Sequence, residues 1–453
     1  MRNIFQIVFI LIFPLVLQAQ TDSSFVGALT KGNLTGQVRL MSITTWNKAE
    51  LSDYSAGAVG LTLGYQTLSF KGFRLAISGS LTQQIYSPNF SIPDSKTLQL
   101  NRYEWGMFDF TNPNNKDMLL RLQELNLQYR SKKIQTLIGN YLPQNIFLNA
   151  QDGRMSPTLV QGLSVKYFPS TKWQIGLEAI TGLNPRSAVK WVSVANSFGI
   201  YPVGLNPDGT KSQYAGHTTT NGIGIAEVTF KPNSKWQILA SDILVENVFH
   251  TAYLKTEYRK SIWNNQQLLL GGLLAMQEQV GNGGSMVASQ VYFTKENKPI
   301  IVNARLGLKD KKWEGSLNFG RITAQGRFQM PREWGVEQFY TFIPRERNEG
   351  SGDVWAYSAK YAYTFSKNLK LEAAYGYYNM PDVRDTRLNK YGVPDYSHTM
   401  LNLQYSFEGN WKGLTLQALG IYKANQGLVY DNLKYVQNKV DMSQLNLVVN
   451  YKW

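Results

Sequence analysis

The sequence predicts an all-β chain that closes into a transmembrane antiparallel β-barrel of about 18 strands. Three observations lead to this fold class. Side chains alternate between apolar and polar in segment after segment, short and long connections tend to alternate between those segments, and no stretch beyond residue 20 is apolar for the length that a membrane-spanning helix needs. The aromatic content of 13% fits the same class, because such barrels place aromatic rings at both membrane interfaces.

The alternation is clear in the segment 73–84. Phe73 and Leu75 share one face of an extended chain, and Arg74 and Ser78 share the other. In a barrel wall the first set would face lipid and the second would face the lumen. The same pattern places strands near residues 33–46, 55–67, 73–84, 119–130, 134–141, 162–168, 173–181, 222–230, 236–245, 251–259, 263–276, 300–309, 313–321, 354–365, 369–379, 398–407, 413–423 and 443–453.

The connections predict how the barrel sits in the membrane. Short ones such as 131–133 and 366–368 tend to alternate with longer ones, as expected for periplasmic turns on one side and external loops on the other. An even strand number places both chain ends in the periplasm. The run 286–294 also alternates, but counting it as a strand would make the number odd, so we expect a loop there. The longest connections are expected at residues 85–118, 142–161, 182–221, 277–299 and 322–353.

The first residues have the layout of a cleavable export signal. Arg2 supplies a positive start, an apolar run extends from Ile7 to Leu17, and Ala19 is a small residue at the expected cleavage position. We therefore expect residues 1–19 to be a signal peptide and residues 20–453 to form a single barrel domain in the outer membrane of a Gram-negative bacterium.

The composition excludes several chemistries. Cysteine is absent, so the chain has no disulfide, no thiol nucleophile and no cysteine metal ligand. His217, His250 and His398 are isolated from one another and show neither metal-ligand spacing nor the partners of a hydrolase. No glycine-rich phosphate loop follows a predicted strand. We therefore expect no enzymatic activity, no cofactor and no bound metal.

The formal net charge of +15 raises the question of an acidic partner. Lys and Arg are scattered along the chain, and no basic run of the kind found in nucleic-acid-binding arms occurs. Because export also separates the chain from nucleic acid, we expect none as a partner. The expected partners are small polar or anionic solutes and outer-membrane lipid, while the pattern leaves the oligomeric state open.

Several loop motifs resemble those of the OprD family of outer-membrane porins. They are FLNAQDGRMSP at residues 147–157, PREWG at 331–335, FYTFIPRERNEG at 339–350 and LNKYGVPDY at 388–396. The resemblance spans nearly the whole chain and is weakest over 183–300. It implies an eighteen-stranded barrel, a constriction loop near 142–161 that folds into the lumen, and passive, substrate-preferring diffusion of small carboxylate-bearing solutes such as amino acids or small organic acids.

The resemblance also implies where selectivity would arise. It places Asp152 and Arg154 at the pore constriction, which would act together with a row of basic wall residues to guide carboxylates. The alternation along each predicted strand, here called parity, then identifies the charged side chains that would face the lumen. The basic candidates are Arg39, Arg74, Lys166, Arg305, Lys370 and Lys423, and the opposing acidic candidates are Glu124, Glu178 and Glu372.

Each candidate also has a purely structural interpretation. Inward charges can pair across neighbouring strands and keep the lumen hydrated without selecting a solute. Asp152 and Arg154 can form an ion pair that fixes their loop, and both roles are compatible. For Arg345, Glu346 and Arg347 we expect structural pairing on a long loop. Rings near strand ends are expected at the lipid headgroup level. They are Trp46, Tyr65, Trp173, Trp236, Tyr405, Tyr451 and Trp453.

Other functions and one other fold remain as alternatives. A barrel whose pore is closed by its loops could act as a surface binding or assembly protein. A transporter of hydrophobic solutes would need an N-terminal hatch, and too few residues precede the first predicted strand for one. A soluble sandwich or propeller would also show alternation, but the strands predicted here often exceed the nine residues that a tilted membrane strand needs.

Overall fold

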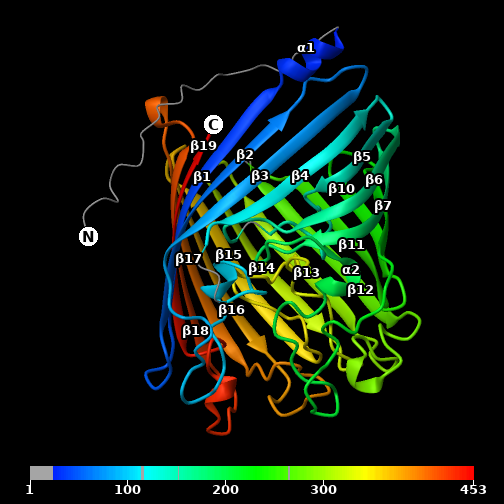
Figure 1. Cartoon of the computed structure of the whole chain (residues 1–453). Helices are drawn as coiled ribbons and strands as arrows, with labels where there is room; N and C mark the ends of the chain where they lie inside the picture. The colour runs from blue at the N-terminus through cyan, green and yellow to red at the C-terminus, as the bar shows by residue number, and fades with distance from the viewer. Residues whose placement is uncertain (1–23, 114–116, 152, 264–265) are drawn as a thin grey trace.

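The computed structural model shows a closed antiparallel β-barrel (Figure 1). The structure describes residues 24–113, 117–151, 153–263 and 266–453. Its sheet contains nineteen strands, of which β8 (Val192–Ser193) is a two-residue strand beside the wall, so the wall has eighteen. β1 (Asn33–Trp46) pairs with both β2 (Tyr54–Gln66) and β19 (Met442–Lys452), which closes the ring. The predicted fold class is confirmed, while the predicted signal peptide lies outside the described residues.

The remaining wall strands follow one another around the ring, and each corresponds to a predicted segment. They are β3 (Phe73–Tyr86), β4 (Leu119–Arg130), β5 (Ile134–Tyr141), β6 (Leu159–Ser170), β7 (Trp173–Asn184), β9 (Ile223–Phe230), β10 (Trp236–Val245), β11 (Phe249–Ser261), β12 (Gln267–Gln279), β13 (Ile300–Lys309), β14 (Trp313–Ile322), β15 (Val354–Thr364), β16 (Leu369–Asn379), β17 (Tyr396–Ser406) and β18 (Leu414–Asn425). The run 286–294 contains a short 3-10 helix, η2 (Ala288–Gln290), and no wall strand. Strand ends differ from the prediction by a few residues because cross-strand pairing sets them.

The wall presents apolar side chains outward and polar ones inward. Leu75 on β3 lies opposite Leu127 on β4, and both are exposed on the outer surface. Their neighbour Ser78 faces the interior and is buried. At the strand ends, Trp173 stacks on Phe230 with ring centroids 4.2 Å apart. Such an outer surface suits hydrocarbon flanked by interfacial aromatic rings.

The two ends of the barrel differ (Figure 1). One end, here called the turn end, carries short turns and the C-terminus; the other, the loop end, carries the long connections. Two loop-end connections, 47–53 and 246–248, are nevertheless short, so connection length alternates less regularly than the prediction suggested. The other loop-end connections are 87–118, 142–158, 185–222, 280–299, 323–353, 380–395 and 426–441.

A short helix, α1 (Phe25–Thr30), lies outside the wall at the turn end (Figure 1). Ser24 caps it by accepting a hydrogen bond from the Gly27 N–H at 2.9 Å. The Tyr65 hydroxyl donates to the Leu29 carbonyl at 2.5 Å, so this ring, which was expected at the headgroup level, also holds α1. None of the helices in the described part of the chain is long and apolar enough to cross a membrane.

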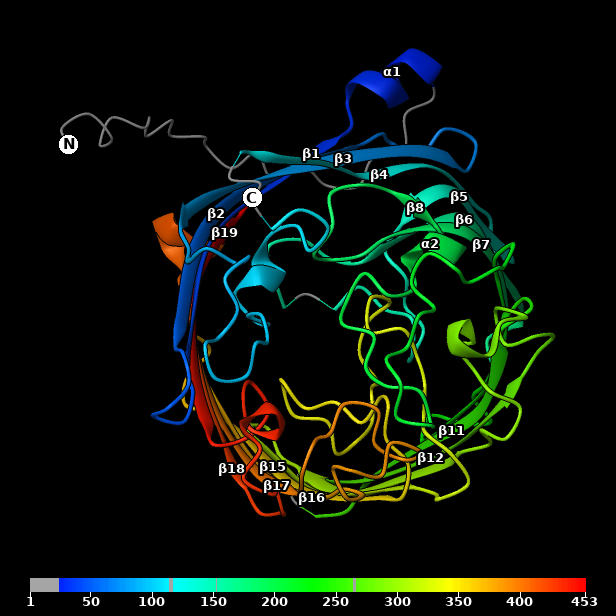
Figure 2. The ribbon, with the colours of Figure 1, turned by 60° about the horizontal axis from the view of Figure 1, so that its bottom comes forward.

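Several long loops fold back inside the ring (Figure 2). They bury an apolar core at the loop end of the lumen. Trp334 is fully buried, its indole N–H donates to the Ser197 hydroxyl at 2.8 Å, and its ring packs edge-on against Phe198 at 5.2 Å. Phe147 from another loop packs on Phe328. Parity, which treats every inward side chain as facing water, therefore does not describe this part of the interior.

Replacing Trp334 by alanine should loosen the inner loops and leave the wall intact. Loss of a buried aromatic side chain costs about 3–5 kcal/mol, whereas the strand ladders do not involve this residue. Limited proteolysis should cut the loop 323–353 faster, while the heat-modifiable electrophoretic mobility of the folded barrel should persist. Trp411→Ala is the control, because that ring is exposed at the turn end. Unchanged loop cleavage in Trp334→Ala would contradict the loop core described here.

Candidate functional site

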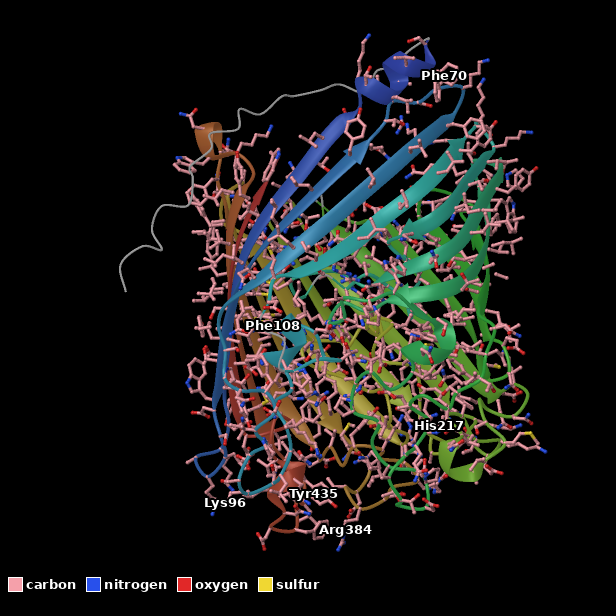
Figure 3. All side chains as sticks on the ribbon, in the orientation of Figure 1. Phe70, Lys96, Phe108, His217, Arg384 and Tyr435 are labelled. Atoms are coloured by element: carbon pink, nitrogen blue, oxygen red, sulfur yellow. The ribbon has the colours of Figure 1, made fainter. Side chains whose placement is uncertain are left out.

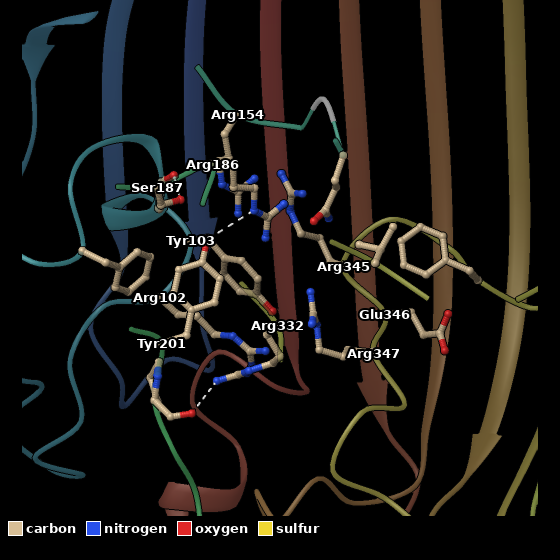
Figure 4. Close-up of a pocket in the computed structure, with 16 residues that line it drawn as sticks. Arg102, Tyr103, Arg154, Arg186, Ser187, Tyr201, Arg332, Arg345, Glu346 and Arg347 are labelled. Atoms are coloured by element: carbon tan, nitrogen blue, oxygen red, sulfur yellow. Dashed lines mark hydrogen bonds between the residues drawn. The ribbon is translucent and has the colours of Figure 1, made fainter. Parts of the chain in front are cut away.

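The inward loops meet at a narrow cavity lined with arginine side chains, here called the arginine cavity (Figure 4). Its volume of about 70 Å³ leaves room only for small molecules. Because the arginines come from loops far apart in the sequence, only the folded barrel brings them together. They are Arg102, Arg154, Arg186, Arg332, Arg345 and Arg347.

Two loops are fastened to each other on one side of the cavity. The Ser187 hydroxyl donates to the Gly106 carbonyl at 2.5 Å, and the Phe110 N–H donates to the Ser187 carbonyl at 2.9 Å. The Phe110 ring then packs against Tyr201 with centroids 4.7 Å apart. The Tyr201 hydroxyl in turn accepts from Nε of Arg186 at 3.4 Å, which orients that guanidinium.

Arg154 is held both through its side chain and through its own backbone carbonyl. Its Nη1 donates to the Gly153 carbonyl at 2.8 Å, and its own carbonyl accepts from the Arg39 guanidinium on β1. A Cβ added at Gly106 would lie 3.1 Å from Nε of Arg154, so glycine permits this close approach. Asp152, the predicted partner of Arg154 at the constriction, lies outside the described residues.

Arg345 adopts a backbone conformation that favours glycine, with φ of 77°. Such a conformation costs on the order of 1–3 kcal/mol and persists where surrounding contacts enforce it. Here the contacts come from the wall strand β19. Nε of Arg345 donates to Gln444 at 2.6 Å, and Nη2 donates to Asn446 at 2.7 Å. Both partners are neutral amides, so the positive charge is oriented without being neutralised.

Arg332 and Arg347 line the opposite part of the cavity. Nη2 of Arg332 donates to the Pro202 carbonyl at 2.8 Å, and its Nε lies 3.7 Å from Glu349. Nη2 of Arg347 donates to the Gly335 carbonyl at 3.3 Å. Among the described residues, Arg332 is the only one of the six arginines with a carboxylate within 4.0 Å.

Among the described residues, one acidic side chain, Glu346, belongs to the cavity lining, and Figure 4 shows it turned away from the arginine cluster. Its carboxyl group accepts hydrogen bonds from the Ile343 N–H at 3.1 Å and from the Asn348 amide at 2.5 Å. Burial, reinforced by the nearby Glu337, raises the pKa of Glu346 to about 8. At pH 7 this group is therefore mostly protonated and supplies little negative charge.

The arginines disfavour one another's charge. Burial, together with the neighbouring Arg186, lowers the pKa of Arg345 to about 10, which still leaves it protonated at neutral pH. Burial and Arg345 lower the pKa of Arg154, and burial and Arg332 lower that of Arg102. A cluster of like charges in a desolvated site is costly, and an anion placed among them would offset that cost.

One predicted wall residue, Arg39, lies next to the arginine cavity. It lines a second cavity of about 430 Å³, to which Arg154 and Arg345 also contribute. This second cavity extends toward the turn end, where Lys452 lines it. Arg154 and Arg345 therefore form a wall that the two cavities share.

The other predicted residues lie apart from this site. A third cavity of about 320 Å³ near the turn end is lined by Arg74, Lys166, Glu124 and Glu178, among others. Arg305 forms an ion pair with Glu314, and Lys370 pairs with Glu372 at 2.5 Å. Nζ of Lys423 lies 4.0 Å from the centre of the Tyr396 ring. The sets predicted by parity thus occupy several places along the wall rather than one row at the arginine cavity.

Sequence reasoning missed most of the arginine cavity because its residues lie on loops, for which parity gives no direction. The motifs PREWG and PRERNEG contain Arg332, Arg345 and Arg347, so the loop resemblance carried a usable signal for these three. Nothing in the sequence singled out Arg102 or Arg186. For Arg345 the expected structural contacts exist, and the same side chain also lines the cavity.

An eighteen-stranded closed barrel with inward loops that surround a basic cavity defines the class of fold: a porin-type β-barrel. No family model matches the chain, and no curated protein matches its sequence. The fold is nevertheless shared with solved structures of the Occ and OpdK type, so the predicted resemblance is confirmed for the fold.

Three of these structures show how far the similarity extends. OpdK of Pseudomonas aeruginosa, crystallised with vanillate, has a TM-score of 0.70 and 14% identity over 93% of this chain and 98% of that chain. OccAB3 of Acinetobacter baumannii gives 0.73 and 13% over 93% and 99%, respectively. OccK9 (OpdG) of Pseudomonas aeruginosa gives 0.72 and 13% over 94% and 99%.

The raised pKa of Glu346 predicts a pH dependence of loop docking. The folded state retains its proton between the ordinary glutamate pKa and about 8, so docking weakens as pH rises through this window and does not change further above it. Glu346→Gln should dock like the wild type at pH 4 and more firmly at pH 8. Limited proteolysis of the loop 323–353 at both pH values measures this. Glu408→Gln, at the exposed turn end, is the control, and equal protection of wild type and Glu346→Gln at pH 8 would contradict the assignment.

Proposed function

We propose that this chain is an outer-membrane channel through which small carboxylate-bearing solutes diffuse passively. One observation carries the proposal: in the described part of the chain, the cavity inside the barrel is lined by six guanidinium groups and by one carboxyl group, that of Glu346, which is turned away from them. Guanidinium groups bind carboxylates in a planar, often bidentate geometry. The porin-type fold supports an outer-membrane location after removal of the signal peptide at residues 1–19.

The proposed mechanism involves no bond chemistry. A solute that reaches the arginine cavity exchanges hydration for hydrogen bonds to Arg154 and Arg345, and these two side chains also face the second cavity toward the turn end. Because the two cavities share them, the anion can move on by exchanging partners. Conduction through a channel needs such successive sites, each strong enough to admit the ion and weak enough to release it.

The predicted site residues take different parts in this proposal. Arg154 acts at the constriction with Arg39 next to it, and Asp152 is proposed there on the basis of the loop motif. For the remaining wall charges we adopt the structural interpretation: most share a cavity or an ion pair with a charge of opposite sign, and Lys423 packs on the Tyr396 ring. These are Arg74, Lys166, Arg305, Lys370, Lys423, Glu124, Glu178 and Glu372.

A second candidate function is a barrel closed by its loops that binds or assembles at the cell surface. The apolar core around Trp334 and the small volume of the arginine cavity favour it. The crystal structure of OpdK with vanillate, a carboxylate anion, supports the channel instead, because OpdK has the same fold. Conductance separates the two, because a closed barrel passes no ions.

In planar bilayers the purified protein should conduct and prefer anions. Under a potassium chloride gradient, the double variant Arg154→Ala and Arg345→Ala should shift the reversal potential toward cation preference, because two fixed positive charges leave the narrowest part of the path. Arg384→Ala is the matched control: this arginine lies at the tip of the loop end (Figure 3) and does not line the cavity. A reconstituted protein without conductance would exclude the channel.

A further inference from the structure

We propose that the arginine cavity selects solutes with two anionic groups, such as a short dicarboxylate, over monocarboxylates of the same length. This inference rests on the proposed channel function and narrows its substrate class. The first observation behind it is that most guanidinium groups of the cavity lack a neighbouring carboxylate. Arg102, Arg154, Arg186, Arg345 and Arg347 have no carboxylate within 4.0 Å in the described part of the chain.

Three described carboxylates on the same loops accept hydrogen bonds from other groups. Glu104 accepts hydrogen bonds from Thr45 and Asn101, both at 2.5 Å. Glu333 accepts from the Tyr201 N–H at 2.7 Å, and Glu337 accepts from backbone N–H groups of its own loop. None of these three carboxylates belongs to the cavity lining. They reduce the cost of gathering the arginines but leave the inner surface positive.

Two guanidinium donors on different cavity-lining side chains lack a hydrogen-bond partner. Nε of Arg154 and Nη1 of Arg186 are buried and have no hydrogen-bond partner. Buried donors are normally satisfied, and leaving one unpaired costs about 1–3 kcal/mol. Both residues line the cavity, so acceptor atoms of a solute can satisfy both donors.

Charge and valence favour a dianion over a monoanion. One carboxylate offers two oxygens and offsets one positive charge, which would leave four of the five unneutralised guanidinium groups without a counter-charge. Even if Asp152 is counted as one more carboxylate, cations remain in excess. A second anionic group on the same small solute adds at least one charge-assisted hydrogen bond, and the rings of Tyr103 and Phe342 line the space between for its carbon chain.

Succinate and butyrate, which have four carbons each, provide the matched probes. In bilayers under bi-ionic conditions, succinate should be at least about tenfold more permeant than butyrate, the equivalent of one charge-assisted hydrogen bond of about 1.5–3 kcal/mol. Arg186→Gln should bring the ratio close to one. Arg186→Lys, which keeps the charge but loses the planar fork, should give an intermediate ratio and covers the case in which the glutamine variant fails to fold.

Arg74→Gln is the control, because it removes one positive charge from the lumen wall outside the arginine cavity. It should leave the ratio unchanged. An equal fall in Arg74→Gln and Arg186→Gln would overturn the assignment to this cavity, and a wild-type ratio near one would overturn the preference for dianions while leaving the channel in place. A protein that passes neither probe would instead remove the proposed channel function.

Discussion

The closure of the strand ladder is the constraint on which the rest of the structure depends. In hydrocarbon each backbone N–H and C=O needs a partner within the protein, and an open sheet edge would leave a row of them unpaired. Here β1 meets that need by pairing with β19 from Gln37 opposite Lys452 to Trp46 opposite Ser443. Once the ring is closed, every second side chain has a fixed destination, and the interior is wide enough to hold several loops. Those loops exclude water from part of the lumen and build a second core around Trp334.

The barrel treats its positive charges in two ways. On the wall, Arg305 and Lys370 sit beside carboxylates, so their charge is neutralised where it stands. In the arginine cavity, Arg345 is held by the neutral amides of Gln444 and Asn446, which orient the group and leave its charge in place. Because neutral acceptors leave the charges in place, the like charges of the neighbouring arginines repel one another, and this repulsion costs free energy in a desolvated site. In the proposed channel, a passing anion would offset this cost, which would link the loop architecture to selectivity.

The sequence predicted the wall much better than the site. Alternation identified all eighteen wall strands, because lipid and lumen impose a period of two on every strand; it also correctly excluded the run 286–294. The site was out of its reach because Arg102 and Arg186 lie on loops whose direction is set by contacts such as Ser187 with Gly106, distant in the sequence. Parity correctly turned Arg39 toward the lumen, but it could not show that the loop bearing Arg154 would dock on it.

Because the chain contains no cysteine, a single introduced thiol can test whether the arginine cavity is accessible to water and has a positive field. Val336 lines both the arginine cavity and the second cavity, and Val336→Cys changes the side-chain volume little. The measurement is the rate at which this thiol reacts, in the folded barrel, with anionic sulfonate-bearing and cationic trimethylammonium-bearing methanethiosulfonates. A positive field in a hydrated cavity predicts faster modification by the anionic reagent, with the difference shrinking at high salt. Equal rates, faster reaction with the cation, or a thiol that neither reagent reaches would contradict it.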